Sequence, residues 1–131
     1  MNLQLNAVTL GVKDINRAKK FYTEGLGCTI DQDHPGFVSL KVGDGPVKLG
    51  LYTLDALAAD AGVPAEGSGF RGVTLNFIVE GGESEKRIAE VIAKAKSAGA
   101  TVLKPAQKAQ WGGYFGHFSD PDGYIWKVTG Y

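Results

Sequence analysis

The sequence predicts an α+β fold made of two tandem βαβββ modules. The first observation is that the hydrophobic pattern of each half gives the same order of elements, which is a strand, a helix and then three strands. The second is a shared tripeptide, Val8-Thr9-Leu10 and Val73-Thr74-Leu75, which lies at the same place in the first strand of each half. Two copies are too few for a solenoid, and the matched order of elements favours a duplicated module over chance identity.

The elements of the first half follow from alternation, capping and glycine placement. Residues 5–12 alternate and are β-prone, which predicts a strand. Asp14 can cap a helix that begins at Ile15, since apolar residues then recur at helical spacing. Gly25 and Gly27 are expected to end this helix. Three strands are then expected over 28–32, 36–42 and 47–53, with a hairpin turn at 43–46.

The second half repeats this order after a connection. Residues 55–61 can form a short helix, and 62–70 are typical of a flexible connection. A strand at 72–79 precedes a helix over 84–98, which Gly99 closes. The apolar stripe of that helix consists of Ile88, Val91, Ile92 and Ala95. The remaining strands are expected near 101–104, 112–119 and 124–129. We therefore expect one domain over 1–131, with module one at about 1–55, the connection at about 56–70 and module two at about 71–131.

Composition limits the partners and the location. The chain has 131 residues, 44% of them hydrophobic and 21% charged, with a formal net charge of zero. This balance is typical of a globular domain and gives no electrostatic reason to expect nucleic acid or a membrane as partner. The single cysteine, Cys28, excludes an intramolecular disulfide and a cysteine-zinc site. Because no basic leader or cleavage pattern opens the sequence, we expect a reducing, cytoplasmic location.

Two stretches resemble a known family. The opening AVTLGVKDINRAKKFYTEGLG is similar to the first module of the vicinal oxygen chelate superfamily, which groups glyoxalases, bleomycin-resistance proteins and extradiol dioxygenases. The shared pattern is met by Val12-Lys13-Asp14, Phe21-Tyr22 and Leu26-Gly27. The closing FSDPDGYIWKV resembles the family's final hairpin, so the resemblance covers nearly the whole chain. It implies the glyoxalase/bleomycin-resistance fold, in which curled mixed sheets form a cup around one cavity.

The resemblance also implies where a metal would sit. In the family's enzymes four residues hold a divalent cation, and the matching positions here are Ala7, Gly50, Gly72 and Lys127. Alanine and glycine side chains have no donor atom, and a protonated lysine repels a cation. We therefore expect no metal site, and no cofactor.

Alternation along the final hairpin predicts the neighbours of Lys127. If the turn at 120–123 is tight, Phe118 lies opposite Ile125 and Gly116 opposite Lys127. Lys127, Phe118 and Tyr114 would then look into the cup. The other face, expected to pack on a helix, would hold Phe115, His117, Trp126 and Val128.

The same reasoning gives a set of candidate ligand contacts and no catalytic residue. Small or polar side chains on the inner strands leave room for a ligand, and Trp111 could stack on a flat molecule. The candidates are Lys127, Trp111, Tyr114, Phe118, Thr9, Asn76 and Tyr52. Core packing is the alternative for the aromatic members. Lys127 either meets an anionic ligand or extends its charge to solvent or, with a lowered pKa, acts as a base or Schiff-base amine.

Three hypotheses for the function remain open. The first is a metal-independent small-molecule-binding protein of the glyoxalase/bleomycin-resistance type, with an apolar, aromatic or anionic ligand. The second is an enzyme with a non-standard site, which would be a glyoxalase-like lyase or isomerase or a dioxygenase. The third is an interaction module whose pocket is vestigial. A homodimer is expected, because cups in the family are often completed across a two-fold interface.

Overall fold

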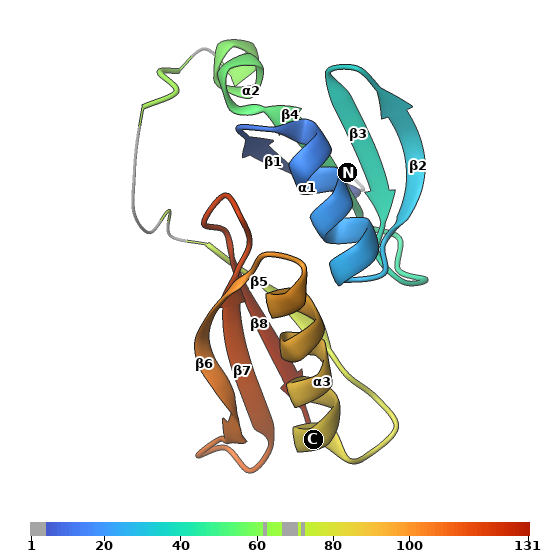
Figure 1. Ribbon diagram of the computed structural model, residues 1–131, viewed down its shortest axis with the longest axis vertical. Coiled ribbons are helices and arrows are strands. Elements are labelled where there is room, and N and C mark those ends of the chain that lie inside the picture. Colours follow the sequence, from blue (N-terminus) through green and yellow to red (C-terminus); the bar gives the residue numbers. More distant parts are fainter. Residues whose placement is uncertain (1–4, 62, 67–70, 72) are drawn as a thin grey trace, which may run out of the picture. The chain divides into compact units, whose positions relative to one another are not determined.

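The computed structural model describes residues 5–61, 63–66, 71 and 73–131. The chain forms two units, Met1–Gly67 and Ser68–Tyr131. Each unit has the predicted order of a strand, a helix and three further strands (Figure 1). The expected connection is partly helical, and its residues 62 and 67–70 lie outside the described part.

Unit one is a four-stranded mixed sheet with a helix along one face (Figure 1). Its strands lie in the order β1-β4-β3-β2, with β1 parallel to β4 and the other pairs antiparallel. Its elements are β1 (Ala7–Val12), α1 (Ile15–Lys20), the π-turn η1 (Phe21–Gly25), β2 (Thr29–His34), β3 (Phe37–Lys41), β4 (Lys48–Thr53) and α2 (Leu54–Ala61).

Unit two has the same design. Its strand order is β5-β8-β7-β6, and again the first strand is parallel to the last. Its elements are β5 (Thr74–Ile78), α3 (Ser84–Ser97), β6 (Thr101–Lys108), β7 (Tyr114–Ser119) and β8 (Ile125–Gly130). The predicted α+β class and the repeated βαβββ order are thus confirmed. The two sheets are separate and neither is closed.

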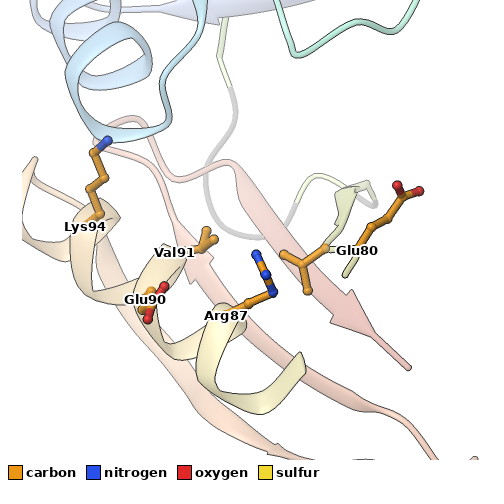
Figure 2. A pocket seen from close by; sticks show the side chains of 6 residues that line it. Glu80, Arg87, Glu90, Val91 and Lys94 are labelled. Carbon is orange, nitrogen blue, oxygen red and sulfur yellow. The ribbon is translucent and has the colours of Figure 1, made fainter. Parts of the chain in front are cut away.

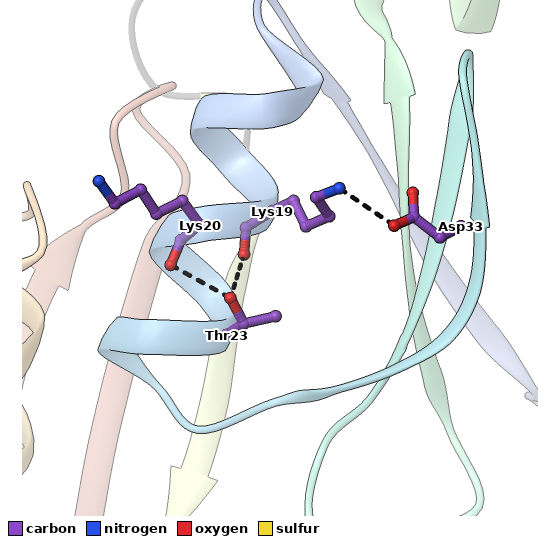
Figure 3. A network of polar contacts seen from close by, with 4 residues as sticks. All are labelled: Lys19, Lys20, Thr23 and Asp33. Atoms are coloured by element: carbon purple, nitrogen blue, oxygen red, sulfur yellow. Dashed lines mark hydrogen bonds and ion pairs between the residues drawn. The ribbon is translucent and has the colours of Figure 1, made fainter.

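The first helix begins as predicted but changes its winding. The Asp14 carboxylate caps it by accepting a hydrogen bond from the Arg17 backbone N–H at 3.0 Å. After Lys20 the helix widens into η1, where the Thr23 hydroxyl donates to the carbonyls of Lys19 and Lys20 at 2.8 and 3.4 Å (Figure 3). The side chain of Thr23 thereby supplies a donor where the helical winding changes.

An ion pair ties this helix to the neighbouring hairpin. Lys19 Nζ lies 3.0 Å from Asp33 Oδ2 on β2 (Figure 3). Both side chains are partly exposed, so the pair adds little to stability. None of the helices in the described residues is long and apolar enough to cross a bilayer.

Each sheet buries one face against its helix. In unit one the largest side chains beneath the sheet are Phe21 and Tyr22, whose rings meet edge to face at 4.9 Å. The sheet residues they cover are Leu10, Val12, Val38, Leu40, Leu49 and Leu51, all buried. The other face carries small and polar residues, among them Thr9 and Gly50, and Leu54 and Leu57 of α2 pack over Gly11 at its edge.

Unit two follows the same rule around α3. Ile88, Ile92 and Ala95 form its buried stripe, while Val91 is only half-buried, which departs from the predicted stripe. The sheet residues opposite the helix are Phe118, Trp126 and Val128, all buried. Gly116 allows the close approach, because a Cβ there would collide with the Ile92 side chain and lie 3.3 Å from Ile88 Cγ2.

Candidate functional site

The final hairpin is paired one residue away from the predicted register. His117 lies opposite Lys127, and Phe118 lies opposite Trp126 instead of Ile125. The cause is the turn at 120–123. The Asp120 N–H donates to the Tyr124 carbonyl at 2.8 Å, so three residues separate the closing pair. Asp120 Oδ1 fixes this turn by accepting from the N–H groups of Asp122 and Tyr124 at 2.9 and 2.8 Å.

The new register exchanges the two faces of β7. Phe118 is fully buried against α3, and Tyr114 shares that face by alternation, so placing them beside Lys127 was wrong. Phe115 and His117 were predicted on the helix side, and they lie instead on the face of Lys127. The placement of Trp126 and Val128 under the helix is confirmed.

We call this face, opposite α3, the open face of unit two. Asn76 of β5 is the register partner of Lys127 on β8, and Lys104 of β6 is the partner of His117. This face thus brings together two predicted residues, Lys127 and Asn76, and three further residues that the sequence analysis did not predict as part of the site. The open face of unit two consists of Asn76, Lys104, Phe115, His117 and Lys127.

An exposed aromatic pair lies near the start of β7 and the end of β8. Trp111 and Tyr131 have ring centroids 5.4 Å apart, and the two residues are 49% and 82% exposed. A Cβ at Gly113 would meet the Trp111 ring, so that ring lies against the chain just before β7. The predicted candidate Trp111 therefore lies beside Tyr131, near the start of β7 and the end of β8.

Two lysines lie close to the Phe115 ring on this face. The Nζ atoms of Lys104 and Lys127 lie 5.7 and 5.5 Å from the Phe115 ring centroid, within the range of cation–π attraction. Strands β5 to β8 contain no Asp or Glu. Within the described part of unit two, neither ammonium has a carboxylate partner, so both positive charges are left uncompensated.

His117 stays neutral in this setting. Burial lowers the pKa of its imidazole below the ordinary value, and the charges of Lys127 and Lys104 lower it further. Its Nδ1 atom is buried and has no hydrogen-bond partner among the described residues. Protonation would place an N–H there with no acceptor, which disfavours the charged form for the same reason. The imidazole also meets the Phe115 ring edge to face at 5.6 Å.

Unit one has its own open face, which carries the remaining candidates. Thr9 is the register partner of Gly50, and Tyr52 contacts the Phe37 ring at 5.8 Å. A Cβ at Gly50 would lie 3.0 Å from Thr9 Oγ1 and 3.2 Å from the Phe37 ring. An acidic side chain at position 50 would therefore have to displace its neighbours.

One lysine of this first face has a carboxylate partner, unlike those in unit two. The Asp31 carboxylate accepts hydrogen bonds from Lys48 Nζ at 2.9 Å and Ser39 Oγ at 3.1 Å. The hydrogen bond from Lys48 is the main reason that the pKa of Asp31 lies below its usual range.

The residues at the family's metal positions do not fit a divalent cation. Ala7, Gly50 and Lys127 lie on β1, β4 and β8 and offer no ligand atom, while Gly72 lies outside the described residues. Among the described residues, no three His, Cys, Asp or Glu side chains are grouped so that they could hold a metal.

A hollow on the outer side of α3 is separate from the open face. Its volume is about 330 Å³, and Figure 2 shows that charged side chains line it. The lining residues are Val79, Glu80, Arg87, Glu90, Val91 and Lys94. Its two acidic and two basic side chains cancel in charge, so it selects no ligand class.

Comparisons with known proteins agree with this architecture. The family model of the Glyoxalase/Bleomycin resistance protein/Dioxygenase superfamily matches residues 4–128. No curated protein matches. A glyoxalase-related enzyme from Fulvimarina pelagi is 27% identical, with a TM-score of 0.85 over 98% of this chain and 88% of that one.

More distant structures share the fold. A glyoxalase/bleomycin resistance protein/dioxygenase family enzyme from Burkholderia phytofirmans is 22% identical, with a TM-score of 0.82 over 98% of both chains. Hypothetical protein SA1046 from S. aureus is 20% identical, with a TM-score of 0.84 over 100% of this chain and 95% of that one. The family match spans nearly the whole chain and both βαβββ units. This protein belongs to the glyoxalase/bleomycin resistance protein/dioxygenase superfamily.

Proposed function

We propose that this protein is a metal-independent small-molecule-binding member of its superfamily, which holds an aromatic, apolar or anionic ligand on the open face of unit two. The observation that carries the proposal is the pair of lysines around the Phe115 ring, together with the exposed rings of Trp111 and Tyr131 near the start of β7 and the end of β8. Exposed aromatic rings offer stacking surface, and the lysines can fix the orientation of a polar group.

Metal independence rests on the side chains at the family's metal positions. Hard divalent cations need several oxygen or nitrogen ligands at once, and Ala7, Gly50 and Lys127 supply none. Elemental analysis of the purified protein tests this directly. A stoichiometric Ni, Zn, Fe or Mn that survives dialysis against a chelator would contradict it.

Ligand binding is tested by thermal shift against a panel of flat aromatic compounds. A ligand at 100 times its dissociation constant stabilises the native state by about 2.7 kcal/mol, which raises the melting temperature measurably. Trp111→Ala and Lys127→Ala should reduce the shift. Lys96→Ala, an exposed substitution on α3, is the matched control and should leave it unchanged.

A second candidate is a glyoxalase-like lyase or isomerase with a non-standard site. The observation in its favour is a neutral imidazole, His117, directly opposite Lys127. A neutral imidazole can take a proton from a substrate carbon while a nearby ammonium stabilises the resulting enolate. Exchange of α-protons of a 2-oxo or 2-hydroxy aldehyde into deuterated water, lost in His117→Asn, would support this candidate.

The expected homodimer and cytoplasmic location complete the proposal. Strands β1 and β5 are edges of their sheets and need cover, which a second copy could supply. Light scattering on the purified protein distinguishes a dimer from a monomer. The buried, reduced Cys28 suits a reducing compartment.

A further inference from the structure

We infer that the open face of unit two selects an aromatic acid that is ionised at neutral pH. This inference rests on the proposed function and narrows its ligand class. The anionic group would lie between Lys104 and Lys127, and the flat apolar body would lie along Phe115 toward Trp111. Neutral aromatics would bind more weakly, and aromatic cations would be excluded.

The charge balance of the two sheets is the first argument. The same strand order builds both open faces, yet Lys48 in unit one is paired with Asp31 at 2.9 Å. In unit two, strands β5 to β8 supply two lysines to the open face and no acidic residue. The first face therefore supplies a carboxylate to one of its lysines, whereas the strands of the second face supply none.

The positions of the lysines are the second argument. Lys104 and Lys127 come from strands on opposite sides of β7, and both ammonium groups lie within 5.7 Å of the same Phe115 ring. Both positive charges therefore lie close to one apolar ring. A ligand that combines an oxyanion with a flat ring meets both properties at once.

The remaining side chains of this face carry no negative charge. His117 lies opposite Lys127 and does not repel a carboxylate there. Asn76, opposite Lys127, adds an uncharged amide that can donate a hydrogen bond to an oxyanion. No described side chain on the open face of unit two would repel an anion.

The test compares three probes of the same shape by calorimetry: 1-naphthoate, 1-naphthamide and 1-naphthylmethylammonium. We expect 1-naphthoate to bind about tenfold more tightly than the amide, which is about 1.4 kcal/mol, since two partly exposed lysines attract its carboxylate. The ammonium probe should not bind measurably. The preference for the acid should shrink as salt is raised.

Matched variants assign the preference to the two lysines. The double variant Lys104→Met and Lys127→Met should lose the preference while still binding the amide, and Lys96→Met on α3 should keep it. Melting temperatures of the variants confirm that they are folded. Equal affinity for acid and amide in the native protein, or an acid preference that survives in the double variant, would overturn the inference and leave the proposed function standing. If none of the three probes binds, the proposed function falls as well.

Discussion

His117 and Lys127 are direct register partners on β7 and β8, and their side chains share the open face of unit two. A lysine thus occupies the family's fourth metal position and lies beside a histidine that it helps to keep neutral. An acidic residue at position 127 would do the opposite and favour the imidazolium. A lysine in place of a metal-binding acid at position 127 therefore changes the charge of the whole face.

The first prediction concerns stability below neutral pH. Since the pKa of His117 is lower in the native state than its ordinary value of 6.5, the unfolded chain takes up the proton first as the pH falls. The contribution of His117 to stability is present above pH 6.5 and is lost as the pH falls below it. The loss of melting temperature between pH 7.5 and 5.5 should therefore be smaller in His117→Asn than in the native protein.

The Asp31 carboxyl does not contribute to that comparison. The pKa of the Asp31 carboxyl lies below 3.8, so Asp31 does not titrate between pH 7.5 and 5.5. An equal loss of melting temperature in the native protein and in His117→Asn would contradict the lowered pKa.

The second prediction concerns the charge at position 127. Lys127→Glu replaces repulsion by attraction, so the pKa of His117 should rise, and NMR titration of the imidazole protons measures it. The groups facing His117 are then Lys104 from β6 and Glu at position 127 on β8, with Phe115 beside it. A pKa that stays unchanged would show that the charge at position 127 does not contribute to the lowering.

The same variant should not acquire a metal. Ala7 and Gly50 still lack donor atoms, and one carboxylate is too few for a divalent cation. Elemental analysis of Lys127→Glu after incubation with Ni, Zn or Mn and dialysis should find no stoichiometric metal.

The sequence was sufficient for the order of elements because periodicity is a local property. Alternation and helical spacing located every strand and both main helices within a few residues. The strand expected to end at 104 continues to Lys108, although Pro105 lacks an N–H. The pairing with β7 is irregular between Lys104 and Gln107, and this irregularity accommodates the proline.

The candidate site was only half predictable because faces depend on register. A shift of one residue at the turn exchanges the faces of β7, and the residues 120–123 alone do not say which pair closes the loop. The Asp120 side chain, which accepts hydrogen bonds from two backbone N–H groups, determines which pair closes the loop. Lys127 and Asn76 were predicted on the correct face, because the alternation along β8 and β5 does not depend on that turn. Phe115 and His117 lie on β7 and were predicted on the opposite face. An Asp at the start of a three-residue turn is the sequence signal that could have predicted the correct face for Phe115 and His117.

The third prediction concerns the single thiol. Cys28 is 5% exposed, and burial raises its pKa to about 11. The thiolate that reacts with disulfide reagents is therefore scarce at pH 8, and access to it is poor. A colorimetric thiol assay at pH 8 should give little reaction in the native protein and one thiol per chain in denaturant. Rapid labelling of the native protein would contradict this assignment of Cys28 to the core.

The last prediction tests the contact that fixes α3 on its sheet. Gly116→Ala would place a methyl group against Ile92, 3.3 Å from both Ile88 Cγ2 and the Lys104 carbonyl oxygen. Overpacking of this kind costs about 1–3 kcal/mol, which should appear as a lower midpoint in urea unfolding. Gly36→Ala is the matched control, since nothing lies within 4 Å of a Cβ there and its φ is not in the left-handed region. That variant should be neutral or slightly more stable, because alanine restricts the unfolded chain. Equal midpoints for the two variants would mean that β7 can move away from α3 at little cost, and the open face of unit two would then be less rigid than its packing implies.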